Sequence, residues 1–71
     1  MVNLENLLIG IGLNYQRTTS TGWRYFSDGR GRSAIFYRGG VLLYSSVTGR
    51  EMFVDNGDEM AGIRYVLDHW N

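Results

Sequence analysis

Three short apolar runs lie in the middle of the chain, separated by two breaks that each contain glycine. The runs are SAIFYR at residues 33–38, VLLYSSV at 41–47 and REMFV at 50–54. The first break is Gly39 with Gly40, and the second is Thr48 with Gly49. Tight hairpin turns need a positive φ, which glycine adopts without a steric penalty. The pattern therefore predicts three antiparallel strands joined by two tight hairpins.

Further elements are predicted on the N-terminal side of these strands. Asn3 can cap a first helix, in which apolar residues recur at helical spacing over residues 4–11. Residues 15–21 are polar and rich in threonine, so we expect a loop. Residues 22–27 contain three aromatic residues and predict a strand, and the glycine-rich residues 28–32 predict a hairpin loop.

A second helix is predicted at the C-terminal end, over residues 59–70, with Asp58 or Asn56 as its cap. One apolar stripe along it is formed by Met60, Ile63, Val66, Leu67 and Trp70. The order helix, four strands, helix predicts a single α+β domain over residues 1–71. We expect a four-stranded antiparallel meander flanked by an N-terminal and a C-terminal helix.

The predicted sheet is apolar on both faces. With two-residue turns, Tyr37 lies opposite Leu42, while Tyr44 lies opposite Ile35 and Phe53 on the same face. The other face carries Ala34, Phe36, Leu43, Ser45, Met52 and Val54. In a meander with one solvent-exposed face, apolar and polar residues would alternate along each strand.

Two arrangements explain this pattern. The helices cover one face each, or both pack on one face and leave the face with Tyr37, Tyr44 and Phe53 uncovered. We favour the second, since helices of about ten residues are short for covering four strands from both sides. An uncovered apolar patch of this kind usually marks an interaction site.

The composition excludes several kinds of chemistry. The 71 residues include no cysteine, and His69 is the only histidine, so disulfides and Cys/His zinc sites are excluded. His69 lies near the end of the predicted second helix, where a positive charge interacts favourably with the helix dipole. We therefore expect a solvated helix-end residue and not the general acid or base that histidine often provides. Gly29 and Gly31 are not followed by the lysine and the helix that a phosphate-binding loop requires. The acidic residues within 55–59 do not have the spacing of a calcium-binding loop. We expect no catalytic residue, no metal site and no cofactor.

The formal net charge is zero but unevenly distributed. Residues 14–50 hold six arginines and one aspartate, and residues 51–71 hold five acidic residues and one arginine. This asymmetry either supports directional recognition of a partner or is neutralised within the molecule by the acidic helix. No apolar run approaches the ~20 residues of a membrane span, and the short apolar run at residues 7–13 lacks a preceding basic residue. We expect a cytoplasmic protein without membrane contact.

Arginine and aromatic residues are interleaved along the predicted strands and loops. These residue types are enriched at protein interfaces, and they also bind nucleic-acid phosphates and bases. The candidate binding residues are Trp23, Arg24, Tyr25, Arg30, Arg32, Tyr37, Arg38, Tyr44 and Phe53. The alternative interpretation is that the aromatic residues form the core and the arginines are solvated strand ends.

In size, compactness and lack of catalytic residues, the chain resembles the small inhibitors encoded by phages and mobile elements, such as anti-CRISPR proteins. This resemblance in profile implies occlusion of a partner's surface and assigns no residue a role. The meander of residues 23–26, 33–38 and 41–46, followed by a helix, also resembles the N-terminal DNA-binding domain of tyrosine integrases, whose sheet enters the major groove.

The sequence thus favours a non-enzymatic protein-binding module. Nucleic-acid binding through the basic sheet is the first alternative and a structural homodimer is the second; we do not expect a DNA mimic. For the favoured function, Tyr37→Ala, Tyr44→Ala or Arg30→Ala is expected to abolish partner binding with little loss of fold.

Overall fold

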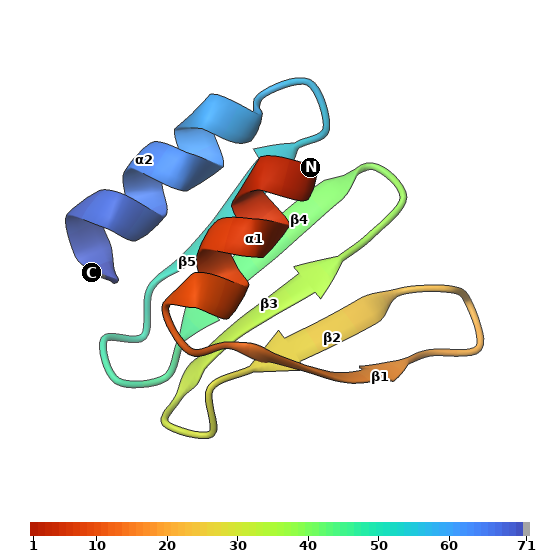
Figure 1. Ribbon diagram of the computed structural model, residues 1–71, viewed down its shortest axis with the longest axis horizontal. Helices are drawn as coiled ribbons and strands as arrows, with labels where there is room; N and C mark the ends of the chain where they lie inside the picture. Colours follow the sequence, from red (N-terminus) through yellow and green to blue (C-terminus); the bar gives the residue numbers. More distant parts are fainter. Residues whose placement is uncertain (71) are drawn as a thin grey trace.

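The computed structural model describes residues 1–70, which form one antiparallel sheet and two helices (Figure 1). The elements are α1 (Val2–Gly10), β1 (Asn14–Thr18), β2 (Arg24–Ser27), β3 (Arg32–Phe36), β4 (Gly40–Ser45), β5 (Glu51–Asp55) and α2 (Glu59–His69). The strands are hydrogen-bonded in sequence order, so the sheet is a meander. The predicted α+β fold with an antiparallel meander between two helices is confirmed, but the sheet has five strands and not four.

The additional strand is β1, in a segment that we expected to be a loop. Its five residues are all exposed, because β1 is an edge strand and pairs only with β2. A bulge separates Tyr15 from Arg17, and the side-chain amide of Gln16 donates to the carbonyl of Asn14 over 3.1 Å. The expected loop is limited to the turn after Thr18, where the backbone N–H of Thr19 donates to the carbonyl of Trp23 over 2.8 Å.

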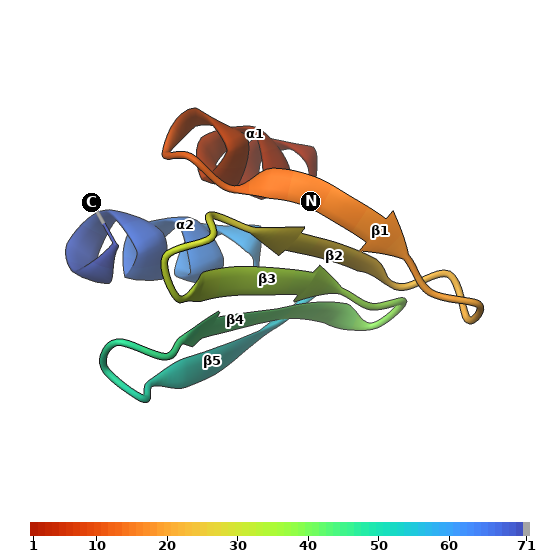
Figure 2. The same cartoon turned by 90° about the horizontal axis from the view of Figure 1, so that it is seen from below.

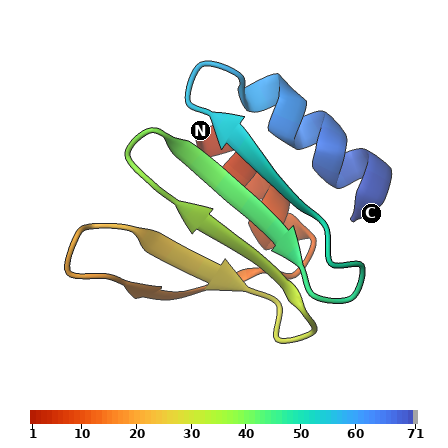
Figure 3. The same ribbon diagram turned by 180° about the vertical axis from the view of Figure 1, so that it is seen from behind.

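Both helices contribute to one core on one side of the sheet. Helix α1 lies across one face and α2 lies beside β5, next to α1 (Figures 1 and 2). The buried apolar residues are Leu4, Leu8, Leu13, Phe26, Ala34, Phe36, Val41, Leu43, Val54, Val66 and Trp70. Seen from the other side, the sheet has no helix in front of it (Figure 3). The favoured arrangement, with one face uncovered, is therefore confirmed.

The strand register differs from the predicted one in both central hairpins. Ile35 lies opposite Leu42, and Leu42 lies opposite Phe53, so the partner of each residue is displaced by two positions from the predicted one. The expected pairs of Tyr44 with Ile35 and with Phe53 are wrong. A displacement by two keeps every side chain on its predicted face, because side chains alternate with a period of two. The predicted assignment of each side chain to one face of the sheet is therefore correct, although the predicted pairs are not.

The cap of the first helix differs from prediction, and that of the second agrees with it. Met1 and not Asn3 is the cap residue of α1, and Asp58 caps α2 without a side-chain hydrogen bond. The carboxylate of Glu59 accepts a hydrogen bond of 2.9 Å from the backbone N–H of Leu4, which supplies an acceptor for the free first turn of α1. Helix α2 is rotated relative to the predicted stripe: its buried residues are Gly62 and Val66.

Two members of the predicted stripe, Met60 and Leu67, are exposed. The rotation follows from Gly62, where a methyl group would lie 2.9 Å from a methyl carbon of Leu4 and 3.1 Å from one of Val54. The missing side chain lets α2 approach α1 and β5 closely, so the helix turns this position inward.

Candidate functional site

An apolar row crosses the uncovered side of the sheet. Tyr25, Ile35, Leu42 and Phe53 lie opposite one another in turn on β2, β3, β4 and β5. Tyr44 extends the same face along β4, and Trp23 and Tyr37 lie at its end, just outside β2 and β3. We call the surface formed by these seven residues the open face.

Three aromatic rings of the open face are in contact. The rings of Trp23 and Tyr37 meet edge to face with centroids 4.5 Å apart, and the centroid of Phe53 lies 6.4 Å from that of Tyr37. Trp23, Tyr44 and Phe53 remain 42%, 38% and 50% exposed. The rings of Trp23 and Phe53 are therefore held by that of Tyr37 yet still offer surface, which lowers the entropic cost of burying them against a partner.

The spacing between β4 and β5 depends on Gly40. Gly40 is buried although it begins a strand, and its φ is not positive. A methyl group here would overlap the carbonyl oxygen of Val54 and would lie 2.8 Å from the ring of Phe53. Gly40 thus serves close packing against Phe53 rather than the primed turn that the sequence predicted.

Charge is confined to the edges of the open face. On β1, Arg17 lies opposite Tyr25, with its guanidinium carbon 5.3 Å from the ring centroid. On β5, Glu51 lies opposite Tyr44 and Asp55 lies opposite Gly40. The interior of the face is uncharged, with a basic edge at β1 and an acidic edge at β5.

Arg24 lies away from the open face and is bound within the molecule. Its guanidinium donates to both carboxylate oxygens of Glu5 on α1, with nitrogen–oxygen distances of 2.6 and 3.1 Å, and lies 5.0 Å from the ring centroid of Phe36. The hydrogen bond from Arg24 holds the pKa of Glu5 below its ordinary value of 4.5, and Glu5 in turn raises the pKa of Arg24. The pair fastens α1 to β2.

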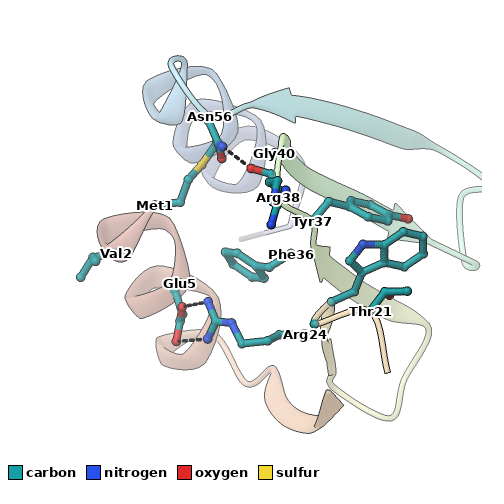
Figure 4. Close-up of a pocket in the computed structure, with 12 residues that line it drawn as sticks. Met1, Val2, Glu5, Thr21, Arg24, Phe36, Tyr37, Arg38, Gly40 and Asn56 are labelled. Atoms are coloured by element: carbon teal, nitrogen blue, oxygen red, sulfur yellow. Dashed lines mark hydrogen bonds and ion pairs between the residues drawn. The ribbon is translucent and has the colours of Figure 1, made fainter. Parts of the chain in front are cut away.

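A cavity of about 460 Å³ adjoins this ion pair at one end of the sheet. Figure 4 shows the Glu5–Arg24 pair and Phe36 on one side of the cavity and Arg38 near Asn56 on the other. The side-chain amide of Asn56 donates to the carbonyl of Arg38, and the backbone N–H of Asn56 donates to Gly39 over 3.1 Å. Arg38 therefore belongs to a fixed turn beside the open face.

The two remaining candidate arginines lie at the opposite end of the sheet. Arg32 donates through Nε to the carboxylate of Asp28 over 2.8 Å and through a terminal nitrogen to the carbonyl of Trp70. Arg30 is exposed at the tip of the β2–β3 loop. Burial raises the pKa of Asp28, but hydrogen bonds from the Arg32 side chain and from the backbone of Arg30 and Arg32 outweigh it and lower the pKa below its ordinary 3.8.

The structure thus divides the candidate residues into three groups. The open face brings together Trp23, Tyr25, Tyr37, Tyr44 and Phe53; Arg24 and Arg38 line the cavity beside it; Arg30 and Arg32 lie at the far end. The sequence selection missed Ile35 and Leu42, which alternate with buried residues in the same strands, and Arg17, which fell in the expected loop. Among residues 1–70, the ion pairs of the sheet arginines are with Glu5 and Asp28, so the acidic helix does not neutralise the sheet by direct pairing.

Within the described part of the chain, no three acidic, histidine or cysteine residues are grouped as a metal site would require. Neither helix of that part has the length and apolar character needed to cross a bilayer. Comparisons with protein-family models, with curated proteins and with solved structures found no match to this chain, so the function is argued from its own residues.

Proposed function

We propose that the chain is a small, non-enzymatic protein-binding module that binds an apolar patch of a partner protein through the open face. The observation that carries the proposal is the row of Tyr25, Ile35, Leu42 and Phe53, which crosses four strands with no helix above it. A contiguous apolar surface of this kind is unusual on a monomer unless it binds something.

The charges at the edges of the open face define the partner's chemistry further. A partner that complements the face carries acidic groups beside Arg17 and basic groups beside Glu51 and Asp55. Its centre is apolar, because no charged residue among the described ones lies between those edges. Edge charges of this kind set orientation and association rate more than affinity.

Nucleic-acid binding is the weaker alternative on the same face. Phosphate binding depends on cations, and Arg24 and Arg32 are engaged by Glu5 and Asp28 on the side that faces the helices. The acidic edge at Glu51 and Asp55 repels phosphate. Aromatic stacking of unpaired bases is the one nucleic-acid contact that the open face favours.

Two sequence-based expectations remain predictions. Occlusion of a partner, as in the small phage-encoded inhibitors, is one way in which such a face acts. A second copy of the chain is another possible occupant, since the basic edge of one copy complements the acidic edge of another.

The test compares open-face variants with a matched control. Tyr44→Ser and Phe53→Ser remove exposed rings from the open face, and Leu67→Ser removes an apolar side chain that is 46% exposed on α2. A partner captured on the immobilised chain is purified, and its affinity is measured by calorimetry. We expect each open-face variant to lose about 2 kcal/mol of binding, close to thirtyfold in affinity, with Leu67→Ser unchanged.

Light scattering and salt titration distinguish the other occupants. The protein-partner proposal predicts a monomer in isolation; a dimer that dissociates in Phe53→Ser identifies a second copy on the face instead. Single-stranded DNA that binds the chain, with affinity falling steeply as salt rises, favours the nucleic-acid alternative. A partner whose affinity is unaffected by Tyr44→Ser and Phe53→Ser contradicts the proposal.

A further inference from the structure

A second cavity lies at the end of the sheet away from the one in Figure 4. The β2–β3 loop, the β4–β5 loop and the C-terminal end of α2 lie at the same end of the molecule (Figures 1 and 3). They border an open cavity of about 470 Å³, which falls within the ~300–1,000 Å³ typical of small-molecule sites. None of the open-face residues lines this cavity, so a ligand site here is independent of the proposed function.

Among the described residues, three arginines and one carboxylate line the cavity. Arg32 is paired with Asp28, and neither Arg30 nor Arg50 forms an ion pair with a residue of the described chain. Two guanidinium groups on adjacent loops, neither paired with a carboxylate of residues 1–70, repel each other and concentrate positive potential in the space that they share. An anion bound in the cavity would relieve that repulsion.

A buried hydroxyl group also faces the cavity. Ser45 lies at the end of β4, is only 4% exposed, and lines the cavity. No hydrogen bond joins its hydroxyl to another residue of 1–70. Since that part of the chain has no fully buried side-chain oxygen without a partner, the hydroxyl borders the cavity and not the packed core. The hydroxyl is a donor that has no acceptor among residues 1–70.

Local contacts fix the loops that carry these groups. The backbone N–H of Ser46 donates to the carbonyl of Gly31 over 2.7 Å, which ties the β4–β5 loop to the β2–β3 loop. Gly31 has a φ of +105°, and a methyl group there would lie 2.5 Å from the hydroxyl of Ser46. Asp28 accepts hydrogen bonds from the backbone N–H groups of Arg30 and Arg32. The site is therefore formed before any ligand binds.

Aromatic rings form the wall on the α2 side. The ring of Tyr65 lies 4.7 Å from that of His69 and 6.3 Å from that of Trp70, and all three residues line the cavity. Carbonyl groups at the C-terminal end of a helix repel anions. Here Arg32 donates to the carbonyl of Trp70 and so opposes that repulsion.

From these features we infer that the cavity is a binding site for a phosphate monoester that carries a planar ring, such as a mononucleotide. The dianionic head, with its three terminal oxygens, matches two guanidinium groups and the hydroxyl of Ser45, whereas a carboxylate matches a single guanidinium fork. The ring packs against Tyr65 and His69, which line the other side of the cavity and are not buried.

The experiment titrates the full chain with three probes by calorimetry at low salt. Adenosine monophosphate tests the whole ligand, inorganic phosphate tests the head alone, and adenosine tests the ring alone. Adenosine monophosphate is expected to bind more tightly than either of the others. Arg50→Gln is expected to weaken its binding about tenfold, and Ser45→Ala about threefold, because each removes one donor to the phosphate.

The matched control is Arg38→Gln, which removes an exposed arginine at the other end of the sheet. It is expected to leave the affinity for adenosine monophosphate unchanged. Equal losses in Arg38→Gln and Arg50→Gln would show diffuse attraction by net charge and overturn the site. Equal affinities for inorganic phosphate and adenosine monophosphate would overturn the ring-bearing class, and failure of all three probes to bind at millimolar concentration would overturn the inference as a whole.

Discussion

The carboxylate of Glu5 on α1 accepts two hydrogen bonds from the guanidinium of Arg24 on β2. This bidentate pair links the first helix to the sheet across 19 residues of sequence, and Arg24 also lies over the rings of Phe26 and Phe36. Arg24, which the sequence predicted to be a binding residue, thus packs against the edge of the core. Substitution of Arg24 is therefore expected to lower the free energy of unfolding, because its contacts are with other residues of the chain.

A double-mutant cycle measures this link. Arg24→Gln and Glu5→Gln are each expected to lower the free energy of unfolding, with a coupling of about 1 kcal/mol. The figure is modest because the Arg24 side chain is 41% exposed and water screens the pair. Urea unfolding followed by circular dichroism supplies the values. A coupling near zero would mean that the pair contributes nothing beyond its packing.

Asp28 makes the stability of the folded chain depend on pH. Its pKa is lower in the folded chain than its ordinary 3.8, because the hydrogen bonds from Arg32 and from backbone N–H groups outweigh burial. A lowered folded-state pKa gives stability that is present above the unfolded pKa and is lost as pH falls through the folded one. The pKa of Glu5 is lowered as well, and it adds a loss of the same sign.

The unfolding midpoint is therefore expected to stay level from neutral pH to about pH 5 and to fall below it. Asp28→Asn is expected to lower the midpoint at neutral pH and to flatten the acid fall, since one of the titrating groups is gone. Asp68→Asn, at an exposed position without an ion pair among the described residues, is the control. An acid fall of equal size in Asp28→Asn and the parent chain would refute this role.

Gly39 and Gly40 are adjacent glycines, and alanine is expected to destabilise the fold at Gly40 but not at Gly39. A methyl group at Gly40 meets the carbonyl of Val54 and the ring of Phe53, whereas a methyl group at Gly39 meets nothing within 4 Å. Gly40→Ala is expected to cost about 1–3 kcal/mol of unfolding free energy, as overpacking does, and Gly39→Ala less than about 0.5 kcal/mol. Thermal or urea unfolding of the two variants tests this. Similar losses in both would place the requirement in the turn conformation and not in the packing.

The pattern of alternation predicted the faces of this sheet better than its details. The central strands follow the period of two, and a register error of two residues leaves Ile35 and Tyr44 on the face that the pattern assigned them. Strand β1 could not be found in this way, because Tyr15, Gln16 and Arg17 are all exposed and the strand pairs with β2 alone. An edge strand of polar residues shows no alternation to detect.

The arginines were harder to place than the aromatic residues. A side chain as long as that of Arg24 reaches whichever carboxylate the fold brings near, and Glu5 lies 19 positions away in sequence. Spacing within a strand says nothing about such a partner. Tyr44 and Phe53, in contrast, are fixed to a face by their own backbone, so their exposure follows from where the helices pack.

Leu43 and Tyr44 are neighbours on β4 whose side chains point to opposite faces, and they distinguish core from open face. Leu43 is fully buried and Tyr44 is 38% exposed. Leu43→Ala is expected to cost about 2–5 kcal/mol of unfolding free energy, because it removes buried contacts and leaves a cavity. Tyr44→Ser is expected to cost less than about 1 kcal/mol, since its ring is covered by no helix.

Urea unfolding of the two variants under identical conditions provides the comparison, with Phe53→Ser as a second open-face position. The interpretation of the open face as a binding surface requires this difference, because a surface kept for a partner adds little to the stability of the free chain. If Tyr44→Ser and Phe53→Ser each destabilise the monomer as strongly as Leu43→Ala, the face contributes to the chain's own stability and its aromatic residues need no partner to explain them.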